Sequence, residues 1–330
     1  MTQEKGNRKK SNRKRATDKS VSRTSTSRDG WVLDRLWGCY RWYDGDHPEK
    51  AVEPLRELIV EACAEFAADS RTVIEVRMYL GRALWRCGCA DEAVDILRAA
   101  LVDSERTCGA RDRLTFSCAG NLVAALSVLH RFDEALELAT ANWRAREEAF
   151  GRHDNGALYS LAALGQVANA SGRLAEAARH YALLEKLRTE AFGREDGRTK
   201  LASFRLSLVN ARISCDSDGI SELLTGWIAS QGPADSYTQE IRQTLAATLE
   251  DEGRLEEAAD QWADQERACF DAYGEVAVPT LVAGANRLRV LVKSGRDGER
   301  RLLAAVCRAI GKIAGPGHPA ARFSDQLNSR

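Results

Sequence analysis

Apolar residues recur at steps of three and four along most of the chain. In one segment Ala135, Leu136, Leu138, Ala139 and Trp143 fall along the same side of a helix. Stretches of roughly 15–18 residues with this spacing are separated by short polar turns. The pattern predicts a succession of helices, each with one apolar face.

Two short sequence marks return about every 42 residues, in fixed phase with each other. The first is a polar turn followed by Glu-Ala, and the second is a glycine that follows a helical stretch. The first mark ends at Ala93, Ala135, Ala177 and Ala258, and the second lies at Gly109, Gly151, Gly193, Gly232 and Gly274. The alanine fits a place where two helices cross closely, and the glycine fits a helix end that needs a positive φ.

These marks divide the chain into helix hairpins. The expected hairpins are 31–67, 70–108, 112–150, 154–192, 196–231, 235–273 and 277–314. The fifth is about three residues short, and we expect Gly226-Trp227 to interrupt its second helix and to change the local curvature. The predicted fold is all-α, a right-handed α-solenoid of about seven antiparallel helix hairpins.

Charge divides the chain into a basic arm and an acidic body. Residues 1–30 hold ten of the 48 Lys and Arg and three of the 48 Asp and Glu, so the remaining residues carry 38 basic and 45 acidic groups. After Met1, Val21 is the only aliphatic residue larger than alanine in 1–29, and such a segment cannot bury enough apolar surface to fold. We therefore expect a disordered basic arm at 1–29, a repeat domain at 30–314, and a tail or incomplete repeat at 315–330.

The residues around the two marks resemble tetratricopeptide repeats. Gly172-Arg-Leu-Ala-Glu-Ala177 is similar to the close of a repeat, and Gly151-Arg-His-Asp154 and Gly317-His-Pro319 are similar to its linker. The long period resembles the kinesin-light-chain type of repeat. The resemblance covers about 31–314 and implies that the first helix of each hairpin lines a concave groove. This scaffold hosts chaperone adaptors, cargo binders and peptide-sensing regulators, so it does not by itself identify the partner.

The resemblance also implies which side chains face the groove, by position relative to the repeated alanine. A set with Arg, Asn and aromatic side chains suits an extended peptide or a partner helix. Because Glu75, Glu240, Glu250 and Asp251 interrupt the cations, we expect patchy charge and an acidic peptide as the favoured ligand. The predicted groove residues are Glu75, Arg82, Trp85, Arg86, Asn121, Tyr159, Gln166, Asn169, Arg205, Arg212, Asn286, Arg289 and Lys293.

The sequence contains none of the common nucleotide-binding, metalloprotease or serine-hydrolase motifs. Cys87-Gly-Cys89 is the nearest approach to a metal motif, but Cys108 would lie at the far end of the next helix. We therefore expect no catalytic residues, no metal and no cofactor. Nine scattered cysteines indicate reduced thiols that fill helix interfaces in a cytoplasmic protein, and no apolar run is long enough for a membrane span.

Three functions remain open, and a protein-interaction scaffold that binds a peptide or partner protein in the groove is favoured. The alternative is a regulatory protein in which the basic cluster at residues 8–15 contacts nucleic acid and the repeats recruit a partner. That cluster has no interleaved aromatics, so its contacts would involve phosphates and would depend on salt. An enzyme with an unrecognised site is the third.

Overall fold

The computed structural model describes residues 28–43, 48–233, 235–315 and 318–321. These residues form fourteen α-helices and one short 3-10 helix, and no strand occurs among them. Consecutive helices pair as α2 (Gly30–Tyr43) with α3 (Glu49–Glu65), α4 (Arg71–Arg86) with α5 (Ala90–Thr107), α6 (Arg113–Val128) with α7 (Phe132–Phe150), α8 (Asn155–Ala170) with α9 (Leu174–Phe192), α10 (Gly197–Ile213) with α11 (Ser217–Gln231), α12 (Ser236–Asp251) with α13 (Leu255–Tyr273), and α14 (Val278–Lys293) with α15 (Arg300–Ala314); η1 (Asp297–Glu299) precedes α15.

The predicted all-α solenoid of seven helix hairpins is confirmed, and the helix pairs coincide with the predicted hairpins to within a few residues. The predicted arm at 1–29 lies outside the described residues except for its last two positions. Of the predicted tail at 315–330, only residues 315 and 318–321 are described. No helix in the described ranges combines the length and the apolar character that crossing a membrane requires.

An N-cap carboxylate fixes where several first helices begin. Asp112 accepts a hydrogen bond from the backbone N–H of Leu114 at 2.7 Å, and Asp154 and Asp196 cap α8 and α10 in the same way. Asp112 is also paired with Arg71 of the preceding hairpin at 2.9 Å. Each such residue therefore starts its own helix, and Asp112 also ties that helix to the preceding repeat.

Small residues let the two helices of a hairpin approach closely. The repeated alanines Ala93, Ala135 and Ala177 are fully buried, as the sequence predicted. On the facing helix, a Cβ at Gly165 would lie 2.8 Å from the ring of the buried Tyr181. A larger residue at this position would push the helices apart.

The fifth hairpin differs from its prediction. Helix α11 runs through Gly226 without interruption, so the expected break in this helix is wrong. Trp227 holds the helix by stacking on Phe204 at 4.8 Å between ring centroids and by donating a hydrogen bond to Asp235. Packing is what changes here, because α11 contacts α12 more than α10 and the buried core divides near Val209.

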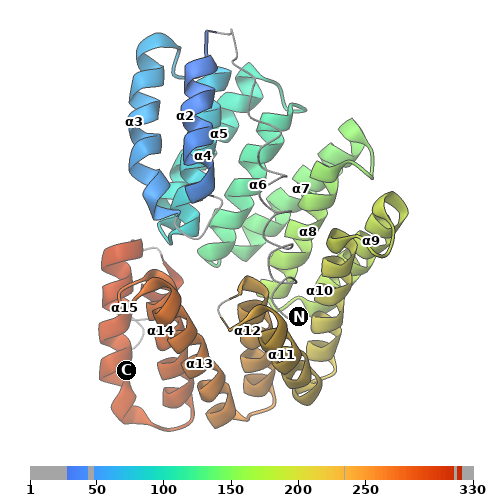
Figure 1. Cartoon of the computed structure of the whole chain (residues 1–330), viewed down its shortest axis with the longest axis vertical. Helices are drawn as coiled ribbons and strands as arrows, with labels where there is room; N and C mark the ends of the chain where they lie inside the picture. Colours follow the sequence, from blue (N-terminus) through green and yellow to red (C-terminus); the bar gives the residue numbers. More distant parts are fainter. Residues whose placement is uncertain (1–27, 44–47, 234, 316–317, 322–330) are drawn as a thin grey trace, which may run out of the picture.

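The first helices form the inner side of the curved array. Neighbouring first helices contact each other, as α4 with α6 and α6 with α8 do, whereas neighbouring second helices barely meet. The row of hairpins bends until α14 and α15 lie beside one end of α4 and α5 (Figure 1). The Cys89 thiol is 3.8 Å from the backbone oxygen of Ile313, although the two residues are 224 positions apart.

Candidate functional site on the inner face

A pocket of about 530 Å³ lies on the inner face, across α4, α6 and α8. It brings together three of the predicted groove residues, Arg82, Asn121 and Tyr159. The other lining residues are Met78, Tyr79, Phe116, Ser117, Gly120, Asn142, Arg146, Ser160 and Ala163. The volume is in the range of ligand-binding clefts, and the lining mixes aromatic and polar groups.

Asn121 is held in place by its neighbours on one wall of the pocket. Its amide nitrogen donates to the backbone oxygen of Ser117 at 2.9 Å, and its amide oxygen accepts from the indole N–H of Trp85 at 3.5 Å. Trp85, another predicted groove residue, packs with its ring partly against the core. At this position its indole N–H points towards the amide of Asn121.

Tyr159 is the most exposed aromatic residue of the pocket, with 61% of its surface accessible. The guanidinium of Arg188, from α9, lies 5.9 Å from the centre of its ring. Arg188 itself is 4% exposed and donates a hydrogen bond to the backbone oxygen of Arg198 at 2.7 Å. Tyr159 therefore stands on a fixed cationic support and presents its ring to solvent.

The deepest polar groups come from α7, a second helix, and the sequence reasoning missed them. Asn142 is 6% exposed; its amide nitrogen donates to the Ser160 hydroxyl, and its amide oxygen has no hydrogen-bond partner within the described chain. Arg146 lies one turn further along, above the ring of Phe116. The missing side chain at Gly120 leaves this region open, because a Cβ there would meet only Asn142, at 3.8 Å.

A signal for these two residues is present in the sequence. The buried face of α7 follows Ala135, Ala139, Asn142 and Arg146 at steps of four, three and four. Two polar residues that continue an apolar face indicate a polar interior or a pocket. Only first-helix positions were assigned to the groove, and for that reason the second helix was overlooked.

Arg146 and Arg188 occupy equivalent positions in successive repeats and share an unusual environment. Arg146 donates to the backbone oxygen of Gly156 at 2.9 Å, as Arg188 does to that of Arg198. Neither guanidinium has a carboxylate within ion-pair distance in the described part of the chain, and the Nε atom of each is buried without a partner. Burial lowers the pKa of both side chains, although each remains cationic. A buried cation without a counter-ion is costly, so this region favours an added anion.

The predicted cations of the C-terminal half are already paired. Arg205 is bonded through two nitrogens to Glu240, at 3.1 and 3.2 Å. Burial alone would lower the pKa of Arg205, but Glu240 outweighs this effect and the pKa is raised. The remaining pairs are Arg212 with Asp251 at 3.6 Å, Arg289 with Glu250 at 2.7 Å, and Lys293 with Glu250 at 3.8 Å.

The other predicted groove residues are dispersed. The amide oxygen of Gln166, with the amide in its favourable orientation, accepts from Arg205 at 2.7 Å. Asn169 is half-buried on α8, and Glu75 is a partly buried residue of α4 whose pKa is raised by burial. Arg86 is exposed at the end of α4, and Asn286 lines a separate cavity of about 370 Å³ together with Arg289. The structure therefore groups only part of the predicted set.

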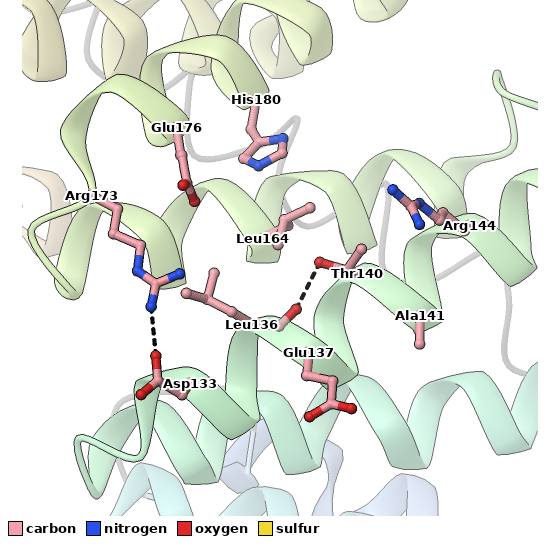
Figure 2. A pocket seen from close by; sticks show the side chains of 10 residues that line it. All are labelled: Asp133, Leu136, Glu137, Thr140, Ala141, Arg144, Leu164, Arg173, Glu176 and His180. Carbon is pink, nitrogen blue, oxygen red and sulfur yellow. Dashed lines mark hydrogen bonds and ion pairs between the residues drawn. The ribbon is translucent and has the colours of Figure 1, made fainter.

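A further hollow of about 510 Å³ lies between α7 and α9, with Leu164 of α8 between them (Figure 2). The hollow lies where an ion pair that is present in two earlier repeats is absent. Arg56–Glu92 and Arg98–Glu134 link successive second helices, but 42 residues further on the arginine is replaced by Thr140, opposite Glu176. The polar lining residues of the hollow are exposed or half-buried, and Arg173 is paired with Asp133, so water already solvates this site.

No group of three or more His, Cys, Asp or Glu suited to a metal occurs in the described residues. The thiols Cys63 and Cys215 are exposed, contrary to the expectation that the cysteines fill helix interfaces, whereas Cys39, Cys118 and Cys269 are buried as expected. The two exposed thiols fall on the water-facing side of a helix and in an inter-helix turn, where no partner helix covers them.

Residues 73–113 and 115–155 match the family model of the tetratricopeptide repeat. The two matched segments begin 42 residues apart, and the structure continues the hairpins before and after them. The hairpins that follow end at Gly193, Gly232, Gly274 and Gly315, each with a positive φ, whereas the first hairpin ends at Phe66. The chain contains tetratricopeptide repeats. No curated protein sequence matches it.

Several solved structures are similar to this tetratricopeptide repeat array. The repeats of a Podosopora anserina protein described as a kinesin light chain are 15% identical, with a TM-score of 0.49 over 68% of this chain and 96% of that chain. A tetratricopeptide repeat protein from Parabacteroides merdae is 14% identical, with a TM-score of 0.46 over 91% and 99%. The family assignment depends on the matched repeats and their continuation along the chain, not on these distant similarities.

Proposed function

We propose that this protein is an interaction scaffold that holds an extended, carboxylate-bearing segment of a partner protein on its inner face, across α4, α6 and α8. Tetratricopeptide arrays are typically non-catalytic scaffolds, and we propose no catalysis for this one. Nine free cysteines suit a reducing, cytoplasmic compartment.

The observation that carries the proposal is the pair of arginines without counter-ions, Arg146 and Arg188, beside an open pocket. A ligand carboxylate that reaches Arg146 would form charge-assisted hydrogen bonds in a partly dry environment. The free amide oxygen of Asn142 offers an acceptor for a ligand N–H group. Tyr159 and Phe116 add apolar contact area on either side.

The contrast between cations with and without a carboxylate partner indicates where on the inner face an acidic ligand would bind. Arg205, Arg212, Arg289 and Lys293 were predicted to contribute cationic charge, but their carboxylate partners neutralise them. A ligand anion would have to displace those carboxylates, whereas Arg146 has no carboxylate within ion-pair distance to displace, only bonds to the Gly156 backbone oxygen and the Ser117 hydroxyl. We therefore place the acidic segment at α4–α8 rather than along the whole inner face.

The proposal is tested by probing an array of short peptides of systematically varied sequence with the full-length protein. We expect enrichment of peptides with Asp or Glu, and a loss of at least about tenfold in affinity in Arg146→Met. Arg179→Met, which removes an exposed arginine of α9, is the matched control and should bind as the parent does. Equal binding by Arg146→Met and the parent, or no acidic preference, would refute the assignment.

The basic arm is kept in every variant, so its own attraction for acidic peptides is constant. The cluster at residues 8–15 lies outside the described residues, and association with nucleic acid stays a prediction from the sequence. A chain in which these cations are replaced by alanine separates the two surfaces. If it loses all acidic preference while Arg146→Met loses none, the arm and not the inner face is the acidic-peptide site.

A further inference from the structure

The two ends of the array meet at a contact that we call the seam. It joins the turn 87–91, between α4 and α5, to α14 and α15. A Cβ at Gly88 would lie 2.9 Å from Val278, and a Cβ at Gly315 would lie 3.3 Å from Asp91. The Cys89 thiol donates across the seam to the backbone oxygen of Ile313 at 3.8 Å. The turn therefore touches the last hairpin closely.

Two thiols lie side by side in this turn. Cys87 is the C-cap of α4 and Cys89 is the N-cap of α5, with only Gly88 between them. The Cys87 thiol donates to the backbone oxygen of Leu84 at 3.3 Å, and the two side chains are close enough to affect each other's pKa. Both side chains are partly exposed, so a small reagent can reach them.

The surroundings distinguish the two sulfur atoms. Cys89 precedes an 18-residue helix, whose N-terminal end stabilises a thiolate. The hydrogen bond from Cys87 lowers the pKa of Cys89 to about 7, against the opposing effect of burial, and Arg56 acts in the same direction. The same hydrogen bond raises the pKa of Cys87, so Cys87 keeps its proton. With a pKa of about 7, Cys89 is present near neutral pH partly as the thiol that donates to Ile313 and partly as a nucleophilic thiolate, next to the protonated Cys87.

We propose that Cys87 and Cys89 are a redox-active dithiol and that its oxidation to an intramolecular disulfide loosens the seam. The oxidant is a hydroperoxide such as hydrogen peroxide. The Cys89 thiolate attacks one peroxide oxygen, the O–O bond breaks, and Cys89 becomes a sulfenic acid while the leaving hydroxide takes up a proton as water. The Cys87 sulfur then attacks the Cys89 sulfur, the S–O bond breaks, and a second water leaves with the Cys87 proton. In the balance, two thiols and one peroxide give one disulfide and two waters.

The structural consequence follows from the hydrogen bonds. A disulfide has no S–H group, so Cys89 no longer donates to Ile313 and Cys87 no longer donates to Leu84. The turn must also bring the two sulfur atoms to the bonded distance of about 2.05 Å. Since Gly88 packs directly against Val278, a change in this turn acts on the contact with α14. Oxidation therefore weakens the link between the second hairpin and the last one.

The test uses the full-length protein treated with limiting hydrogen peroxide at low protein concentration. We expect a disulfide within the 87–89 peptide, detected by mass spectrometry as the loss of two hydrogens, at a rate at least about fivefold above oxidation of the exposed Cys63 and Cys215. Amide hydrogen exchange of α15 should become at least about threefold faster in the oxidised protein, while exchange in α8 stays unchanged.

Two variants define the outcome. Cys87→Ser should stop at the sulfenic acid of Cys89, which a dimedone probe traps, and its α15 exchange should respond less than that of the parent. Cys89→Ser should form neither product at this turn. Preferential oxidation of Cys63 or Cys215, or an 87–89 disulfide with unchanged exchange in α15, would overturn the proposal. Peptide binding on the inner face is tested separately, by Arg146→Met, which leaves both thiols in place.

Discussion

The arginines on the inner face of this array have two different kinds of partner. Over α10–α14, Arg205 forms an ion pair with Glu240, and Arg289 forms one with Glu250. Each carboxylate lies on the first helix of a neighbouring hairpin. Over α4–α9, Arg146 and Arg188 are held by backbone oxygens and aromatic rings, with no carboxylate within ion-pair distance in the described chain. A buried cation that the chain itself neutralises contributes to the fold, whereas one that is not neutralised indicates where a ligand anion would bind.

The geometry explains why the two halves differ. Arg205 and Arg289 extend from first helices along the inner face, where a neighbouring first helix supplies the carboxylate: α12 for both arginines. Arg146 and Arg188 extend from second helices between two first helices, and there they meet the start of the next helix. At Gly156 the meeting is close, because a Cβ there would lie 2.6 Å from the Arg146 guanidinium.

The largest effect is expected where a paired cation loses its partner. Glu240→Gln leaves Arg205 buried without a counter-ion and should lower the free energy of unfolding by about 3 kcal/mol, measured by urea denaturation. Replacing both residues, as Arg205→Met with Glu240→Leu, should restore most of that loss because no charge stays buried. A loss below about 1 kcal/mol in the single variant would show that the pair contributes little.

A smaller change in stability should distinguish the packed core at Gly165 from the open pocket at Gly120. Gly165→Ala forces a Cβ to 2.8 Å from the buried Tyr181 ring and should cost about 2 kcal/mol. Gly120→Ala is the matched change on the neighbouring first helix, where the nearest atom would be 3.8 Å away. It should stabilise the protein by about 0.5 kcal/mol through helix propensity. Thermal unfolding of both variants tests whether the space beside Gly120 accommodates a methyl group without loss of stability.

Removing an unpaired cation should change stability little. Arg146→Met loses the hydrogen bond to Gly156 and a longer one to Ser117, but it also removes the cost of burying a charge, so the free energy of unfolding should change by less than about 1 kcal/mol. The measurement is the same urea denaturation used for Glu240→Gln. A loss as large as that of Glu240→Gln would contradict the contrast between the two halves.

The smallest expected effect is a loss of stability at low pH. The bond from the Arg198 side chain lowers the pKa of Asp196 to about 2, and the bond from Arg71 lowers the pKa of Asp112. Because these values lie below those of the unfolded chain, the stabilisation is present above about pH 4 and is lost as pH falls towards 2. The melting temperature should drop across this range, and Asp196→Asn should reduce the drop. Helix α14, which begins after Ala277, has no such carboxylate cap and contributes nothing to this effect.

Much of the fold could be predicted because its determinants are local. The glycines that end the second helices, such as Gly151 and Gly193, adopt φ values of 86° and 83°, as their positions in the repeat required. The buried Ala135 and Ala177 mark the helix crossings, and the period follows from their spacing. Counting positions from the repeated alanine also predicted three residues that line the pocket, Arg82, Asn121 and Tyr159. Gly226 was misjudged because helix propensity is weaker than the packing of Trp227.

The sequence by itself determined the type of element, its length and its phase, since these depend on residues within one repeat. Only the tertiary structure decided which charges meet and where the array closes. Asn142 and Arg146 became pocket residues because two neighbouring first helices leave room beside Gly120. Cys89 reached Ile313 because small rotations between successive hairpins add up over the whole array. That sum depends on every interface at once, and no single repeat encodes it.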